Sequence, residues 1–174
     1  AYTFEELQAF PLLGTKERIP TFTDVLDVLD GKIPVIVELK PGGDWKRLCE
    51  LTWDILKDYQ GDYCVESFHP LLVRWFYKNA PQVLRGQLSE AFCFSKKFMT
   101  LFQAIIMSRL LTNVLAHPQF IAYHIGPKCL SVRVCEAFGA MKVAWTARET
   151  DDHARLTRKN DAVIFEHYRP DARY

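Results

Sequence analysis

Apolar and polar positions alternate between two patterns along the chain, and these patterns predict strands and helices in turn. Short apolar runs rich in β-branched residues predict six strands, and apolar residues three or four positions apart predict amphipathic helices between them. The predicted strands are residues 33–39, 62–68, 82–89, 119–125, 141–147 and 161–168. The predicted helices are residues 20–31, 45–59, 70–79, 98–116, 128–140 and 150–160. The first 20 residues are polar and turn-rich.

Strict alternation of strand and helix predicts a parallel sheet with helical crossovers. An open doubly wound sheet and a closed (β/α)₈ barrel both fit this pattern. A barrel needs eight strands and about 250 residues, so this chain of 174 residues is about two units short. An open sheet accommodates six strands, but no glycine-rich phosphate loop follows a predicted strand. No linker divides the chain, which predicts a single domain over residues 1–174.

Composition and charge exclude several classes of protein. The chain is 49% hydrophobic with a net charge of +1, which suits one globular core and gives no reason to expect a nucleic acid partner. Its five cysteines are odd in number and show no CxxC spacing, so we expect a reducing, cytoplasmic location. The apolar segment 98–116 contains Gln103, Arg109 and Asn113. These residues favour a buried helix over a transmembrane segment.

Polar residues at the carboxyl ends of the strands are the candidate ligands, because both architectures bind ligands there. The first strand ends in Glu38 and Lys40, whose equal parity directs both side chains to one face. A carboxylate is a hard oxygen ligand for Ca²⁺ or Mg²⁺, and a lysine is a point charge for a phosphate. The alternative is an exposed ion pair of small energetic effect.

The later strands offer further candidates at their ends. The second gives Glu66, Ser67 and His69, the third Gln87 and Ser89, the fourth Tyr123 and His124, the fifth Trp145 and Thr146, and the sixth Glu166 and His167. Tyr123 is assigned to substrate binding. Trp145 provides an apolar surface for a sugar or polyol, or it belongs to the core. His124 and His167 have either a catalytic or a structural role.

Six segments, in this order, resemble the glycerophosphodiester phosphodiesterase family: IPTFTDVLDVL, VIVELK, VESFHP, RGQL, NVLAHPQFIAYHI and VAWT, which run from Ile19 to Thr146. The resemblance implies a TIM barrel of the phospholipase-C-like phosphodiesterase type. It implies hydrolysis of glycerophosphodiesters to glycerol 3-phosphate and an alcohol with one divalent cation, Ca²⁺ or Mg²⁺. By the resemblance, Glu38 binds the metal, Lys40 faces the substrate phosphate, and Trp145 lies near the substrate pocket.

The chain also departs from the pattern of this family. No HRG, E-x-D or HD motif precedes Ile19. We therefore expect the last six βα units of the barrel, without the first two units, the acid/base histidine pair and two of three carboxylate metal ligands. Such a chain would bind metal weakly and have little or no activity alone. Its two unpaired edge strands predict instability or association, although the sequence does not specify an oligomeric state.

Two other functions are compatible with the same residues. One is a non-catalytic barrel that binds a phosphodiester or a partner, since Glu38 and Lys40 are present without the histidine motifs. The other is a related barrel phosphodiesterase that acts on lysophospholipids or inositol lipids. The sequence does not distinguish the alcohol of the substrate.

Overall fold

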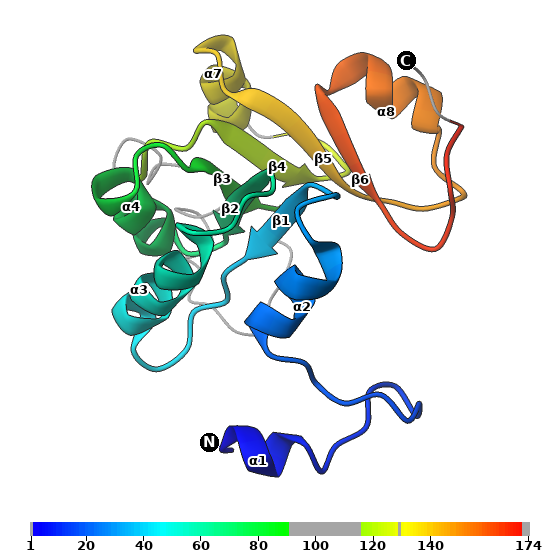
Figure 1. Cartoon of the computed structure of the whole chain (residues 1–174). Coiled ribbons are helices and arrows are strands. Elements are labelled where there is room, and N and C mark those ends of the chain that lie inside the picture. The colour runs from blue at the N-terminus through cyan, green and yellow to red at the C-terminus, as the bar shows by residue number, and fades with distance from the viewer. Residues whose placement is uncertain (1, 91–115, 129, 172–174) are drawn as a thin grey trace.

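The computed structural model describes residues 2–90, 116–128 and 130–171, and its centre is one parallel sheet (Figure 1). The strands lie in the order β1-β2-β3-β4-β5-β6, and each neighbouring pair is parallel. Their bounds are β1 Val35–Glu38, β2 Tyr63–Ser67, β3 Leu84–Ser89, β4 Phe120–His124, β5 Met141–Ala147 and β6 Ala162–Phe165. Each strand falls within the segment predicted from the sequence, so the six strand predictions are confirmed.

The described helices are α1 Phe4–Leu7, α2 Phe22–Leu29, α3 Trp45–Leu56, α4 Pro70–Asn79, α7 Leu130–Ala137 and α8 His153–Lys159. Five of them confirm predicted helices, whereas the predicted helix 98–116 lies outside the described residues except for Ala116. The single-turn helix α1 was not predicted. A capping box holds it, because the Glu6 amide donates to Thr3 Oγ1 and the Thr3 amide donates to Glu6 Oε2.

The strand order decides between the two architectures considered above. Each strand pairs with the next strand along the chain, as in a (β/α) barrel. A doubly wound sheet instead reverses its order at a switch point. The sheet is not closed, because β1 and β6 each pair with one strand within the described ranges. The observed architecture is therefore an open six-stranded portion of a barrel-type sheet.

Helices α3, α4 and α7 pack on one face of this sheet, which we call the outer face. Leu56 of α3 and Phe76 of α4 pack in a buried cluster with Val65 of β2. On the opposite, inner face, a second cluster contains Leu88, Phe120, Ala122 and Val143, with Cys64 and Phe68 packed against it. Alternate residues of each strand thus enter different environments, and this alternation determines which strand-end residues can meet.

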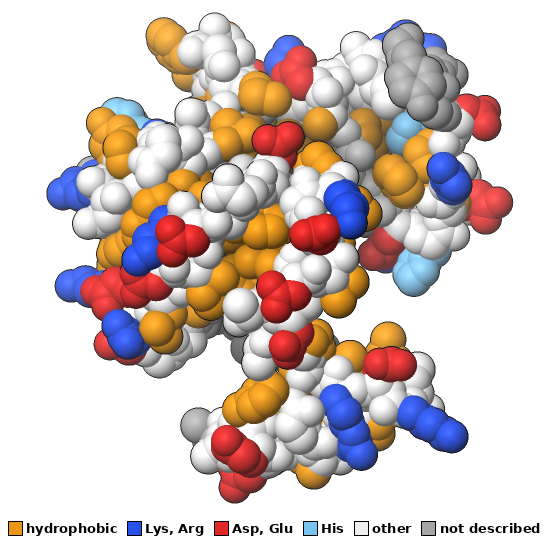
Figure 2. Space-filling view, in the orientation of Figure 1, with side chains coloured by type: hydrophobic (Ala, Val, Ile, Leu, Met, Phe, Trp, Pro, Cys, Tyr) orange, Lys and Arg blue, Asp and Glu red, His pale blue; other side chains and the backbone are white. Residues whose placement is uncertain are grey.

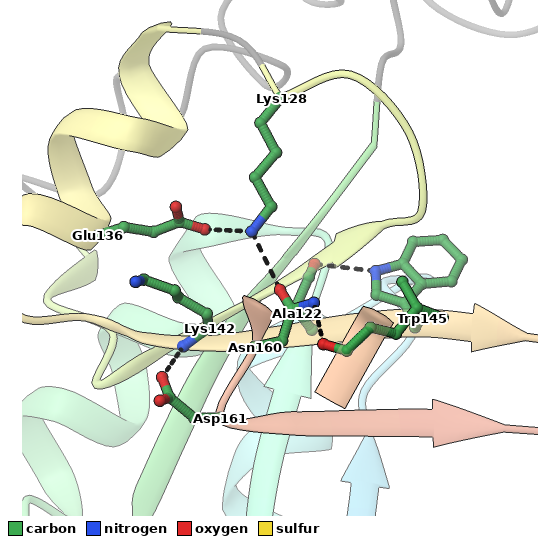
Figure 3. A network of polar contacts seen from close by, with 8 residues as sticks. Ala122, Lys128, Glu136, Lys142, Trp145, Asn160 and Asp161 are labelled. Carbon is green, nitrogen blue, oxygen red and sulfur yellow. Dashed lines mark hydrogen bonds and ion pairs between the residues drawn. The ribbon is translucent and has the colours of Figure 1, made fainter. Parts of the chain in front are cut away.

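A polar network joins the α7 and α8 regions on the side of β5 and β6 (Figure 3). Lys128 Nζ binds Glu136 Oε1 at 2.5 Å and Asn160 Oδ1 at 3.1 Å. The Lys142 amide donates to Asp161 Oδ2 at 2.7 Å. These bonds fix the turn that precedes β6. Within the described residues, no helix combines the length and apolar character that crossing a membrane requires.

Candidate functional site

Glu38 and Lys40 lie at the carboxyl end of β1, where the sequence placed them. Glu38 is the last residue of the strand, and its Oε2 lies 3.7 Å from Lys40 Nζ. The Lys40 side chain is 79% exposed and the Glu38 side chain is 35% exposed. A pair this exposed stabilises the fold by at most about 1 kcal/mol. Both groups can therefore exchange this contact for a ligand at little cost.

A second carboxylate, that of Glu66, lies next to Glu38. The two residues are direct partners in the parallel register of β1 and β2, so their side chains project side by side from the inner face. Glu66 is only 6% exposed, and its Oε2 has no hydrogen-bond partner among the described residues. Burial, with a smaller contribution from the charge of Glu38, raises the pKa of Glu66 to about 7.

The packing of the inner face explains why Glu66 is buried. Cys64 and Phe68, two residues before and after it, both pack against the inner cluster. Gly86 on β3 lies opposite Glu66 of β2 on one side and opposite Phe120 of β4 on the other. The Phe120 ring lies over Gly86, because a Cβ built there would come within 2.0 Å of Phe120 Cε2. The absence of a side chain at Gly86 thus lets an aromatic ring fill the space beside Glu66.

Hydrogen bonds behind the site fix the ends of three strands relative to one another. Ser67 Oγ donates to the Leu39 carbonyl at 2.6 Å. Gln87 Nε2 donates to the carbonyls of Ser67 and Phe68, each at 3.0 Å. Ser67 and Gln87 are 1% exposed, so water does not compete for these bonds. Side chains that emerge from the opposite face, such as Glu38 and Glu66, are held by this rigid frame.

Trp145 lies on the inner face, whereas Tyr123 does not. The Trp145 indole donates to the Ala122 carbonyl at 2.9 Å (Figure 3), and its ring meets Phe68 edge to face at 5.6 Å between centroids. Phe68 connects Trp145 to the strand that carries Glu66. Tyr123 is 3% exposed and packs on the outer face against Val132 of α7. The structure does not bring Tyr123 to Glu38, and its substrate-binding role stays a prediction.

The strand-end histidines make separate contacts. The His124 ring lies edge to face on Trp145, with 5.1 Å between centroids. His167 Nε2 lies 3.8 Å from Glu166 Oε1. His69 precedes α4 as its N-cap residue, and burial lowers its pKa.

The residues present fit part of a carboxylate site for a divalent cation. Within the described residues, no group of three or more His, Cys, Asp or Glu is arranged to hold a metal ion. Glu38 and Glu66 nevertheless provide two adjacent carboxylates, and a buried oxygen of Glu66 has no partner among residues 2–90, 116–128 and 130–171. Mg²⁺ is commonly held by one or two carboxylates together with water and substrate phosphates.

From the sequence, Glu66 was predicted to lie at a strand end but was assigned no role. A signal was present, because the pair VE stands at the end of β1 (VIVE) and one residue before the end of β2 (YCVES). In a parallel sheet, equivalent positions of neighbouring strands lie side by side. The repeated pair could therefore have placed the two carboxylates together.

Solved structures show which known proteins have this fold. The chain is similar to a glycerophosphodiester phosphodiesterase from Parabacteroides distasonis, with 19% identity and a TM-score of 0.67 over 95% of this chain and 67% of that chain. It is also similar to a phosphodiesterase from Oleispira antarctica in complex with the product sn-glycerol-3-phosphate, with 18% identity and a TM-score of 0.65 over 86% of this chain and 58% of that chain. The chain shares the fold of the glycerophosphodiester phosphodiesterases.

This phosphodiesterase fold confirms, at the level of architecture, the resemblance drawn from the sequence motifs. A third structure, from Silicibacter pomeroyi and assigned as a glycerophosphoryl diester phosphodiesterase, is 18% identical with a TM-score of 0.64, and 86% of this chain covers 54% of it. The chain thus spans just over half the length of the Silicibacter and Oleispira proteins. No protein-family model matches the sequence, and no curated protein is significantly similar to it.

Proposed function

We propose that the protein containing this chain hydrolyses glycerophosphodiesters to glycerol 3-phosphate and an alcohol with a divalent cation, Ca²⁺ or Mg²⁺. The observation that carries the proposal is the position of Glu38 and Lys40. They lie together at the carboxyl edge of a sheet with the fold of glycerophosphodiester phosphodiesterases. Ligands of barrel enzymes bind at this edge.

Each residue has a role that its surroundings allow. Lys40 supplies a positive charge for the substrate phosphate, since its side chain is exposed and its ammonium lies 3.7 Å from Glu38 Oε2. Glu38 holds the cation. When bound, the cation stabilises the negative charge that develops on the phosphate oxygens. The Trp145 ring, fixed by its bond to the Ala122 carbonyl, offers an apolar surface to the glycerol or the alcohol.

The chain itself is proposed to bind the phosphodiester and to turn it over slowly. The resemblance assigns acid/base chemistry to a histidine pair, and the HRG and HD motifs of that pair are absent from the sequence. A positioned acid or base typically contributes 10²- to 10⁴-fold to the rate. Binding and catalysis should therefore be measured separately.

The test of the activity uses the natural full-length protein. Release of glycerol 3-phosphate is measured from glycerophosphodiesters that carry choline, ethanolamine, inositol or glycerol, with and without EDTA. We expect release from at least one substrate, inhibition by EDTA and restoration by Ca²⁺ or Mg²⁺. Absence of cation-dependent release from all of them would contradict the proposal. Lysophosphatidylcholine is tested in parallel with choline release as the readout, because its hydrolysis gives lysophosphatidate and not glycerol 3-phosphate. Preference for it would identify the related lipid phosphodiesterase.

The second candidate is a non-catalytic barrel that binds a phosphodiester or a partner. The observation that favours it is the presence of Glu38 and Lys40 without the histidine motifs. This candidate predicts that the full-length protein binds sn-glycerol 3-phosphate and hydrolyses none of the substrates. Hydrolysis at a rate typical of enzymes would exclude it.

A further inference from the structure

We infer that Glu66 is a second carboxylate ligand of the cation that Glu38 is proposed to hold. The inference rests on the proposed function and extends it to a residue for which the family resemblance gives no role. It follows from three observations. These are the register of two strands, the burial of one carboxylate, and an oxygen of that carboxylate that has no partner in the part of the chain that the structure describes.

The register places the two carboxylates within reach of one ion. Glu38 and Glu66 are Cα partners in the parallel pair β1–β2, and neighbouring strands lie about 4.8 Å apart. Both side chains project from the inner face, because the residues before them, Val37 and Val65, pack on the outer face. Two carboxylates at this spacing repel each other unless a cation or a proton lies between them.

Among the described residues, one oxygen of the buried Glu66 carboxylate has no hydrogen-bond partner. Glu66 is 6% exposed, and its Oε2 accepts no hydrogen bond from the residues that the structure describes. Buried charged groups are normally paired, hydrogen-bonded or bound to a metal. The nearby ammonium of Lys40 lies 3.7 Å from Glu38 Oε2, and the Lys40 side chain is 79% exposed, so it lies toward solvent. A divalent cation would satisfy Glu66 Oε2 and offset the repulsion from Glu38.

The surroundings also allow an ion to enter and be held. The Glu38 side chain is 35% exposed, which leaves a route from solvent to the pair. On the other side, Phe120 and Phe68 belong to the apolar packing of the inner face, which lies beside Glu66 in the strand register. The bonds of Ser67 and Gln87 fix the strand ends, and such outer-shell contacts orient metal ligands. Water and the substrate phosphate would complete the coordination.

The experiment uses Mn²⁺ as the probe, since carboxylates and water are its preferred ligands. Binding to this chain is measured from the electron paramagnetic resonance signal of free Mn²⁺, with competition by Mg²⁺ and Ca²⁺. The variants are Glu66→Gln and Glu38→Gln, which keep the side-chain shape and remove the charge. Glu50→Gln is the matched control, because Glu50 is an exposed carboxylate on α3 that pairs with Arg47.

We expect Mn²⁺ binding that Mg²⁺ and Ca²⁺ displace. Glu66→Gln and Glu38→Gln should each weaken it at least about tenfold, whereas Glu50→Gln should bind like the wild type. Circular dichroism verifies that each variant is folded. As a second readout, Mn²⁺ should raise the melting temperature of the wild type and of Glu50→Gln more than that of Glu66→Gln.

The outcomes separate this inference from the proposed function. Wild-type affinity in Glu66→Gln, with loss of binding in Glu38→Gln, would overturn the inference and leave the role of Glu38 intact. A wild-type chain that binds no Mn²⁺ would also overturn it. The proposed hydrolysis fails on a different measurement, the release of glycerol 3-phosphate by the full-length protein.

Discussion

Glu66 is an ionisable residue in a buried position beside a second carboxylate. Its position on the inner face, between Cys64 and Phe68, removes it from water, while Glu38 on the next strand adds a like charge. Both effects disfavour the ionised carboxylate and raise its pKa to about 7. Without a bound cation, the residue therefore destabilises the fold at neutral pH.

The pH dependence of stability should change when Glu66 is replaced by glutamine. Because the pKa of Glu66 is about 7 in the folded chain, above the ordinary 4.5, its contribution to stability is complete below pH 4.5 and is lost as the pH rises through 7. Relative to Glu66→Gln, the wild type should lose up to about 3 kcal/mol between pH 4.5 and pH 8. Chemical denaturation in EDTA at several pH values measures this. Parallel pH profiles for the two chains would refute it.

Gly86 illustrates a second constraint at the scale of one residue. A methyl group there would meet the buried Phe120 ring at 2.0 Å. We expect Gly86→Ala to lower the free energy of unfolding by about 1–3 kcal/mol through overpacking. The double variant Gly86→Ala/Phe120→Leu should lose less than the sum of its two single variants, since the smaller side chain relieves the clash. Additive losses in urea denaturation would argue against this contact.

At the scale of elements, the sequence predicted most of the fold because its apolar pattern is strong. All six strands were found, since a parallel sheet is buried on both faces and its strands read as apolar runs. Helix α1 was missed because one turn, Phe4–Leu7, has no period to detect, and only the Thr3–Glu6 capping box identifies it.

The candidate site was harder to predict than the elements. Tyr123 and His124 are neighbours at one strand end, so they must point to opposite faces, but the sequence alone does not show which face is inner. The position of α7 places Tyr123 on the outer face. The meeting of Glu66 with Glu38 depends on the register of β1 and β2, which is set by packing between distant segments.

At the scale of the whole molecule, the two edges of the sheet are its most unusual feature. β1 and β6 pair on one side only within the described residues, and Ile36 on β1 is 51% exposed. Hydrophobic side chains also gather at the surface around β1 (Figure 2). Exposed apolar edge strands are templates for association with another chain.

We expect the 174-residue chain to associate at micromolar concentrations through such an edge. Ile36→Lys should reduce the association, because a charge on an edge strand opposes strand pairing. Val134→Lys, at an exposed position of α7, is the control and should leave the association unchanged. Sedimentation velocity over a range of concentrations measures both effects. A wild-type chain that stays monomeric throughout would show this expectation to be wrong.

Binding of sn-glycerol 3-phosphate to this chain tests the proposed site most directly. Calorimetric titration is performed with Mg²⁺ or Ca²⁺ and again with EDTA, on the wild type, Lys40→Ala and the control Glu50→Gln. We predict that binding requires the cation and is unchanged in Glu50→Gln. Lys40→Ala should weaken it at least about tenfold, because the lost charged contact contributes about 1.4 kcal/mol or more. Absence of binding, or binding indifferent to both EDTA and Lys40→Ala, would contradict the assignment of Glu38 and Lys40.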